Sequence, residues 1–218
     1  MVFQLSIRRN PDLVQAFNIS YRPGMSILDA LREISAGDAP DLVYRWECGG
    51  QRICGVCTIN VNGQPALSCG VVVQPNTDYL VEPIDGFPVE RDLVVDLHDR
   101  LDALNDYHPY LVEGGRPIET RDEAEGSKLL RTCVECWACV SVCPVSLNTN
   151  SAHALSMVKL ARFALDPRDG ANRVETAREA GLDIYSATCP SCRKCETVCP
   201  KAIDVFVDAI QVLEDANT

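Results

Sequence analysis

Twelve cysteines, gathered into three groups of four, constrain this chain more than any other feature of its sequence. The groups occupy residues 48–69, 133–143 and 189–199. With 218 residues, the chain can bury a hydrophobic core without disulfide staples. It shows no signal-peptide pattern and no apolar run near the length of about 18 residues that spans a membrane. We therefore expect a cytoplasmic protein whose cysteines bind metal rather than pair as disulfides.

The net charge of the chain argues against nucleic acids as partners. The formal net charge is −11, whereas a general nucleic-acid binder needs a basic stripe to contact phosphates. Basic pairs occur at Arg8-Arg9 and Arg193-Lys194, and both are too short to reverse this balance. We expect no nucleic-acid partner.

Residues 1–97 have the pattern of a small sheet with one early helix. Apolar residues alternate over 3–7 and 17–21, which predicts two half-buried strands. Asn62-Gly63 lies between two further strand-like runs, 58–61 and 65–68, and is a strong signal for a tight hairpin. This order of strands, helix and Cys-bearing loop is typical of a β-grasp sheet.

The early helix has its own start signal. Ser26, followed three residues later by Asp29, predicts a capping box. Ile27, Leu31 and Ile34 then recur at helical spacing, so they should form the face that packs on the sheet.

Residues 98–218 have a helical pattern instead. Apolar side chains recur at helical spacing over 157–164 and 203–213, and Asp166-Pro167 should end the first of these helices. The predicted fold class is α+β: a β-grasp domain over residues 1–97, followed by an all-α domain over 98–218.

The second and third cysteine groups repeat one motif, C-x2-C-x2-C-x3-C-P, without change. In this motif three cysteines hold one cubane cluster and the fourth serves the other cluster. Each fourth cysteine precedes a proline that can start a helix. Zinc is the alternative, although zinc sites usually use C-x2-C pairs separated by a longer loop. The predicted [4Fe–4S] ligand sets are Cys133, Cys136, Cys139 and Cys199 for one cluster, and Cys143, Cys189, Cys192 and Cys195 for the other.

The first group resembles a plant-type [2Fe–2S] loop with one inserted residue. Plant-type loops follow C-x4-C-x2-C with a distant fourth cysteine, whereas this chain has C-x5-C-x2-C. Gly49 and Gly50 can adopt positive φ and absorb the insertion. A zinc ribbon is the alternative for this group. The predicted [2Fe–2S] ligands are Cys48, Cys54, Cys57 and Cys69. Residues 1–97 are thus predicted to form a [2Fe–2S] ferredoxin-like domain, and residues 98–218 a helical domain that resembles bacterial ferredoxins with two cubane clusters.

Nearly the whole chain resembles the iron–sulfur subunit of succinate dehydrogenase and fumarate reductase. The segments that carry this likeness are Arg45-Trp46-Glu47-Cys48, Ile53-Cys54-Gly55-Val56-Cys57, Ile59-Asn60-Val61-Asn62-Gly63, Phe87-Pro88-Val89-Glu90-Arg91-Asp92-Leu93-Val94-Val95-Asp96, Pro109-Tyr110-Leu111 and Cys199-Pro200-Lys201.

The resemblance implies an electron-transfer subunit of an oxidoreductase complex. A flavoprotein partner would oxidise succinate or reduce fumarate at FAD, and this subunit would pass electrons between that FAD and a quinone or other acceptor on a further subunit. This chain has no Gly-rich dinucleotide fingerprint, so FAD is expected only in the partner. The resemblance also implies a peripheral place on the inner face of the cytoplasmic membrane.

Cys192 departs from the family pattern. The usual member has no cysteine at this position, and its last cluster is [3Fe–4S]. Here Cys192 restores a fourth thiolate, which predicts a second [4Fe–4S] cluster with a lower potential. If Cys192 packs without ligating, the cluster would be [3Fe–4S].

The quinone site of the family is also altered. Family members have Trp residues shortly after the Cys-Pro that ends the second group, and a His directly after the first cysteine of the third group. This chain has Val145-Ser146-Leu147 and Pro190 there instead. The extra cysteine is similar to forms that pair with a Cys-rich, heterodisulfide-reductase-like subunit in place of a membrane anchor.

Two other functions remain open at this point. The same relay could serve a related flavoprotein that acts on a different enoate or acid. The cysteines could instead bind structural zinc in a protein without redox chemistry. No catalytic set stands out in this chain: His98, His108 and His153 are isolated and are expected at surface or capping positions. Trp137 could shield a cluster or serve in ordinary packing.

Overall fold

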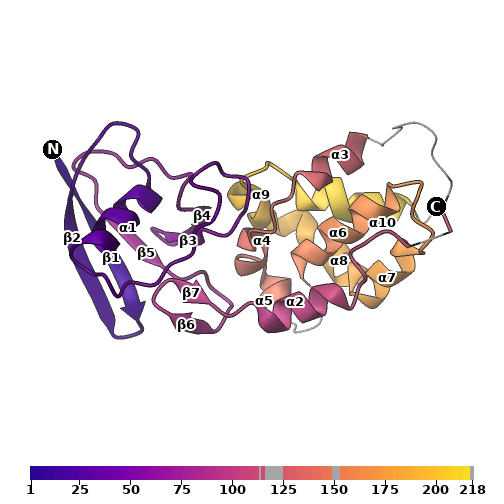
Figure 1. Cartoon of the computed structure of the whole chain (residues 1–218). Helices are drawn as coiled ribbons and strands as arrows, with labels where there is room; N and C mark the ends of the chain where they lie inside the picture. The colour runs from indigo at the N-terminus through magenta and orange to yellow at the C-terminus, as the bar shows by residue number, and fades with distance from the viewer. Residues whose placement is uncertain (113, 116–124, 149–152, 217–218) are drawn as a thin grey trace. The chain divides into compact units, whose positions relative to one another are not determined.

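A computed structural model describes residues 1–112, 114–115, 125–148 and 153–216 of the chain (Figure 1). The chain forms two compact units. The first unit comprises Met1–Leu97 and Val134–Ser141, and the second comprises His98–Cys133 and Val142–Thr218. Part of the second cysteine group therefore belongs to the first unit, which the sequence pattern did not indicate.

A mixed five-stranded sheet with one helix, α1, forms the body of the first unit (Figure 1). The strand order is β2-β1-β5-β3-β4; β1 runs antiparallel to β2 and parallel to β5, and β3 runs antiparallel to β4 and β5. This arrangement confirms the predicted β-grasp sheet. The elements are β1 (Val2–Asn10), β2 (Leu13–Ser20), α1 (Ile27–Ala36), β3 (Thr58–Val61), β4 (Gln64–Leu67) and β5 (Tyr79–Glu82), with a separate pair β6 (Val89–Arg91) and β7 (Val94–Val95).

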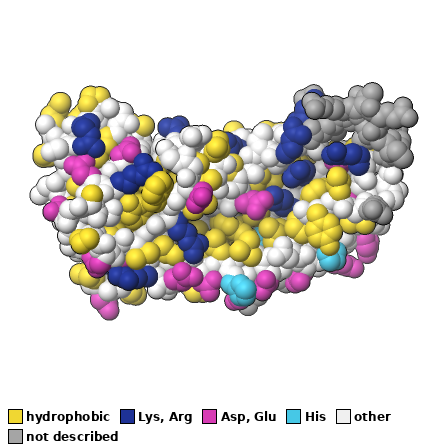
Figure 2. Space-filling view, in the orientation of Figure 1, with side chains coloured by type: hydrophobic (Ala, Val, Ile, Leu, Met, Phe, Trp, Pro, Cys, Tyr) yellow, Lys and Arg dark blue, Asp and Glu magenta, His cyan; other side chains and the backbone are white. Residues whose placement is uncertain are grey.

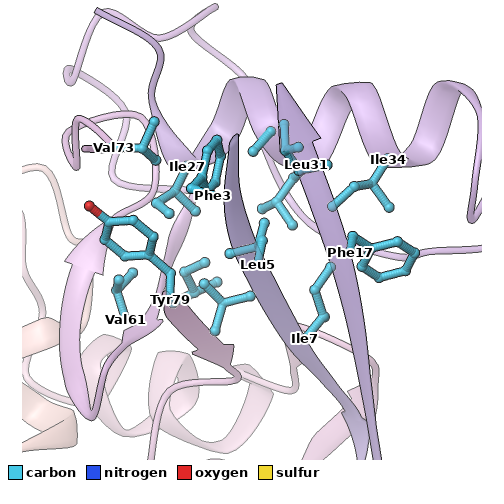
Figure 3. Packing of buried hydrophobic residues seen from close by; sticks show 14 of the residues in the cluster. Phe3, Leu5, Ile7, Phe17, Ile27, Leu31, Ile34, Val61, Val73 and Tyr79 are labelled. Atoms are coloured by element: carbon cyan, nitrogen blue, oxygen red, sulfur yellow. The ribbon is translucent and has the colours of Figure 1, made fainter. Parts of the chain in front are cut away.

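The core of the first unit lies between α1 and the sheet (Figure 3). Phe3, Leu5 and Ile7 alternate along β1 and are at most 2% exposed. Ile27 and Leu31 of α1 face them and are buried to the same degree. Since side chains alternate across a strand and recur every three to four residues on a helix, the two periodicities place one apolar face against the other.

The start of α1 is the predicted capping box. The Ser26 Oγ accepts a hydrogen bond from the backbone N–H of Asp29 (3.2 Å), and the Asp29 carboxylate accepts one from the backbone N–H of Ser26 (2.9 Å). Two N–H groups that would otherwise lack helical partners are satisfied in this way.

The hairpin prediction is also confirmed, although the second strand begins one residue earlier than expected. Asn62 and Gly63 have φ of 52° and 78°, as a two-residue type I′ turn requires. The second strand begins at Gln64, paired with Val61, rather than at Pro65. A two-residue loop leaves no unpaired position between the turn and the strand, which explains the difference.

The second unit is helical, as predicted. Its centre is α6, whose side chains are largely buried against α3, α7, α10 and the π-helix η1. The elements are α2 (His98–Asn105), α3 (Glu125–Arg131), α5 (Pro144–Asn148), α6 (Ala154–Ala164), α7 (Arg173–Glu179), α8 (Leu182–Cys192), α9 (Lys194–Val198), η1 (Val205–Ile210) and α10 (Gln211–Asp215), while α4 (Ala138–Ser141) belongs to the first unit.

The two Cys-Pro pairs, 143–144 and 199–200, are followed by different backbone structures. Pro144 begins α5, as predicted, but Pro200 does not begin a helix. The backbone turns after Pro200, with the N–H of Ala202 donating to the Cys199 carbonyl and Ala202 at φ 54°. The next helix starts at Val205, where Asp204 caps it by accepting from the N–H of Val207 (3.0 Å).

No helix within the described residues has the length and apolarity needed to cross a membrane. On the face shown in Figure 2, basic side chains are interspersed with acidic ones.

His153 caps α6 from a buried position rather than from the surface. Its Nδ1 accepts from the backbone N–H of Ser156 (3.2 Å), and its Nε2–H donates to the carbonyl oxygen of Arg100 (3.1 Å). Both bonds are made by the neutral ring. Burial, aided by the nearby Arg100 charge, lowers the pKa of His153 from 6.5 to about 4.

Acid should therefore destabilise the second unit through His153. The folded pKa lies below the unfolded one, so the stability that the neutral ring contributes is complete above about pH 6.5 and is lost as the pH falls toward about 4. We expect a loss of about 2 kcal/mol between about pH 7 and about pH 5. Urea unfolding at the two pH values measures it. His153→Asn keeps an N-cap acceptor without a titrating ring and should flatten this dependence; an unchanged dependence would contradict the assignment.

Candidate metal centres

All twelve cysteines lie in the part of the chain that the structure describes, and no disulfide joins them. Among the described residues, no three His, Cys, Asp or Glu side chains form a group suited to a single metal ion. The three predicted ligand sets differ in how far the structure brings them together.

The first set is assembled by the β3–β4 hairpin and the loop before it. Cys57 precedes β3 and Cys69 follows β4, so the hairpin brings them together with their Sγ atoms 3.4 Å apart. The N–H of Ser68 donates to the Cys57 carbonyl (3.0 Å) and closes the base of the hairpin. The hairpin over residues 57–69 therefore holds two of the four predicted ligands close together.

The loop before the hairpin directs backbone N–H groups at Cys48. Gly49 and Gly50 have φ of 67° and 97°, the left-handed backbone that lets successive N–H groups point inward. Hydrogen bonds from the Ile53 N–H, from Cys54 and from the Gln51 and Gly50 N–H groups lower the pKa of Cys48 to about 6. A thiolate is the form that binds metal, so this loop is suited to iron.

Cys69 has the opposite electrostatic environment. Burial, followed by the neighbouring Cys57 thiol, raises the pKa of Cys69 to about 11. A buried thiolate is costly unless a cation compensates its charge. The four side chains of the first set therefore fit a bound iron centre, which would supply the missing positive charge.

The structure gathers the cysteines that we assign to the second [4Fe–4S] cluster. Burial first, and then the nearby thiols of Cys143 and Cys192, raise the pKa of both Cys189 and Cys195 to about 12. All four line one narrow cavity in the second unit. Cys143 thus lies with the third group although 46 positions separate it from Cys189 along the chain. The set fits a centre that neutralises several thiolates at once.

The cysteines of the third group lie largely on two short helical segments. Cys189 and Cys192 lie on the last turn of α8, Arg193 turns the chain with φ 51°, and Cys195 lies in α9. Because residues three apart share one helical face, the helix end presents both cysteines to the same side.

Arg193 is a charged neighbour of this set that the motif did not reveal. Its side chain lines the same cavity, forms ion pairs with Glu196 and Asp204, and lies over the ring of Phe206 at 5.2 Å. The sequence showed it only as part of a short basic pair. A fixed positive charge here stabilises nearby thiolates.

The remaining set is divided between the two units. Cys136 and Cys139 belong to the first unit, and Cys133 and Cys199 belong to the second. The Sγ of Cys199 accepts a hydrogen bond from the Ile203 N–H (3.4 Å), as the Sγ of Cys143 does from the Ser146 N–H (3.5 Å). Such backbone bonds to sulfur are common around iron–sulfur clusters. Joint ligation by these four cysteines stays a prediction.

The two tryptophans near the cysteines have different surroundings. Trp137 is 5% exposed and packs edge-on against Phe87, with ring centroids 6.1 Å apart. Trp46, just before Cys48, is 47% exposed and lies under the Arg32 guanidinium at 4.2 Å.

Two domain families match the chain. Residues 2–102 match a 2Fe-2S iron-sulfur cluster binding domain, and residues 129–203 match a 4Fe-4S dicluster domain. These matches agree with the cluster types predicted from spacing in the two halves of the chain.

Several proteins are similar over most of the chain. A subunit of the fumarate reductase (CoM/CoB) of Methanothermobacter marburgensis is 34% identical over 97% of this chain and 42% of its own length. The fumarate reductase iron-sulfur subunit of Escherichia coli O6:H1 is 32% identical over 91% of this chain and 86% of its own length. The chain spans between 38% and 42% of the length of the first three curated relatives.

A solved structure has the same fold. A chain of the Mycobacterium smegmatis Sdh1 complex in the apo form superposes with a TM-score of 0.85, covering 98% of this chain and 94% of that chain at 24% identity. This likeness establishes the α+β architecture over the whole chain.

Proposed function

The chain belongs to the family of succinate dehydrogenase and fumarate reductase iron–sulfur subunits, and from this premise we propose that it relays electrons between a flavoprotein and a further acceptor. The observation that carries the proposal is the set of twelve cysteines at ferredoxin spacings in a chain that matches 86% of a fumarate reductase iron-sulfur subunit. The chain supplies ligands and surroundings for the carriers, and the flavoprotein would supply the substrate site.

Each ligand set has an assigned role. Cys48, Cys54, Cys57 and Cys69 would hold a [2Fe–2S] cluster in the domain of residues 1–97. The domain of residues 98–218 would hold two [4Fe–4S] clusters on the ligand sets given above, with Val134–Ser141 packed in the first unit. When bound, these clusters supply one-electron carriers between the flavin and the acceptor. The protein's part is to place them, limit water and set their potentials.

The second [4Fe–4S] assignment depends on Cys192. It shares the cavity of Cys143, Cys189 and Cys195, and its charge acts on Cys189 and Cys195. A cysteine that only filled space would have no reason to lie among three other thiols. We therefore keep Cys192 as the fourth ligand.

For the partners, we propose an FAD-containing flavoprotein and a Cys-rich third subunit or domain. Pro190 and the Val145-Ser146-Leu147 segment lack the His and Trp side chains that would hold a quinone on this chain, and the Ser146 hydroxyl is buried and accepts a hydrogen bond from the N–H of Ala154. The relative whose name includes CoM/CoB is more than twice as long as the region that matches this chain. This supports placing the final electron acceptor on a further domain or subunit. A membrane anchor with a quinone site is the second candidate, and it would place the complex on the inner face of the cytoplasmic membrane.

Anaerobic purification of the native complex tests the partners. The proposal predicts that a chain carrying FAD co-purifies, together with a Cys-rich chain or domain. A flavoprotein accompanied by a haem-bearing membrane anchor would contradict the Cys-rich partner and retain the relay. Absence of any flavoprotein would contradict the relay itself. Assays of succinate oxidation, fumarate reduction and reduction of other enoates would then identify the substrate of the flavoprotein.

Structural zinc is the competing function, and absorption spectroscopy distinguishes it. Iron–sulfur clusters predict a brown protein whose visible absorption bleaches with dithionite. Zinc predicts a colourless protein with zinc in metal analysis. A colourless protein isolated without oxygen would contradict the electron relay.

A further inference from the structure

Gly55, between two predicted ligands of the first cluster, touches the backbone of the second cysteine group. Both segments belong to the first unit. A Cβ added at Gly55 would lie 2.2 Å from the carbonyl oxygen of Val134 and 3.1 Å from the Cα and Cβ of Cys136. The nearest atom is a backbone carbonyl oxygen, which cannot rotate away as the end of a flexible side chain would. Only glycine permits the two loops to approach this closely.

Two further contacts hold the Cys136 segment on the first unit. Cys136 packs against the buried cluster formed by Leu28, Cys57, Leu67 and Cys69, which contains two predicted ligands of the first cluster. The neighbouring Trp137 is buried against Phe87. The segment is therefore held at Cys136 and at Trp137, in addition to the contact of Val134 with Gly55.

The backbone around Cys136 is strained in a way that this packing explains. Glu135 and Trp137 have φ of 51° and 63°, a left-handed conformation that is unfavourable for residues with a side chain. Such backbone persists only where the surroundings enforce it, and it is concentrated at functional sites. Here it turns the Cys136 segment against the loop that contains Gly55.

We propose that Gly55 is a positioning residue for electron transfer between the first and second clusters. By lacking a side chain, it lets the loop of Cys54 and Cys57 lie directly on the backbone of Cys136, which sets the separation of the two bound clusters. Electron transfer between fixed centres slows steeply as their separation grows. A methyl group at this position would force the loops apart without removing a ligand.

Gly24 offers a matched control outside the cysteine loops. It lies in the first unit with a similar φ of 79°, compared with 71° for Gly55, and a Cβ built on it meets nothing within 4 Å. Gly24→Ala and Gly55→Ala therefore introduce the same methyl group in the same left-handed backbone. The two variants differ in the collision with Val134 and Cys136.

The test uses the native complex, reduced anaerobically and examined by EPR. The reduced [2Fe–2S] signal should relax faster in the wild type because of the neighbouring reduced cluster. Gly55→Ala should keep the amplitude of that signal but saturate at lower microwave power, and rapid electron passage to the second cluster should be lost. Gly24→Ala should match the wild type. If the reduced [2Fe–2S] signals of the two variants saturate at the same microwave power, with both clusters present, the proposal is overturned.

A second variant covers the case in which Gly55→Ala loses the second cluster. Phe87→Ala removes the packing surface of Trp137 and leaves every cysteine and Gly55 in place. This variant should weaken the magnetic coupling between the first and second clusters, which speeds the relaxation of the reduced [2Fe–2S] signal. If Phe87→Ala shows the same coupling as the wild type, the proposal is overturned. The inference rests on the proposed function, whose failure is distinct: a wild-type protein without a reduced [2Fe–2S] signal contradicts the cluster assignment itself.

Discussion

Replacing Cys192 with serine is expected to convert the last cluster from four irons to three. Cys192 shares a cavity with Cys143, Cys189 and Cys195, and these three would remain to hold a [3Fe–4S] cluster. The variant should lose about one iron atom per chain and gain the EPR signal that an oxidised three-iron cluster gives. Because one thiolate and one iron are removed, its reduction potential should rise.

The control for Cys192→Ser is Ser191→Ala. Ser191 is exposed, precedes Cys192 on α8, and donates to the carbonyl of Thr188 (3.2 Å). This variant should retain the wild-type iron content and spectrum. If the wild-type protein, prepared without oxygen, already carries a stoichiometric three-iron signal, Cys192 is not a ligand.

Replacing Cys57 with serine should remove the [2Fe–2S] cluster and leave the other two. Cys57 is 4% exposed and its Sγ lies 3.4 Å from that of Cys69, so the loss leaves a buried site with too few thiolates. We expect the loss of about two iron atoms per chain and of one reduced-state EPR signal. Electron flow between the flavoprotein and the acceptor should fall sharply, because one of the three proposed carriers is missing.

Val56→Ala is the matched control for Cys57→Ser. Val56 is 40% exposed and lies between Cys54 and Cys57, so the variant changes the same loop without removing a ligand. It should keep all three clusters. A Cys57→Ser protein with an unchanged reduced-state spectrum would show that the first group is assigned incorrectly.

Much of the fold was predictable because it depends on local patterns. The alternation of Phe3, Leu5 and Ile7 and the Ser26–Asp29 capping box specify a strand and a helix start from neighbouring residues alone. The Asn62-Gly63 turn does the same for the hairpin that positions Cys57 and Cys69. The cysteine spacings indicated the cluster types that the two domain families independently support.

Features that depend on distant contacts were not predictable. The packing of Val134–Ser141 in the first unit depends on Gly55 and Phe87, which are far away in sequence and carry no local signal for it. The helix expected after Pro200 starts only at Val205, because Asp204 provides the cap and Ala202 reverses the chain first. The place of Arg193 beside the third group likewise follows from tertiary structure.

The central claim is that this chain holds one [2Fe–2S] and two [4Fe–4S] clusters. Iron and acid-labile sulfide analysis of the anaerobically purified subunit, combined with an EPR-monitored redox titration, tests it most directly. We expect about ten iron atoms per chain, three separately titrating reduced-state centres and no stoichiometric three-iron signal on oxidation. About nine irons with such a signal would contradict the second [4Fe–4S] cluster, and zinc in place of iron would contradict the electron relay as a whole.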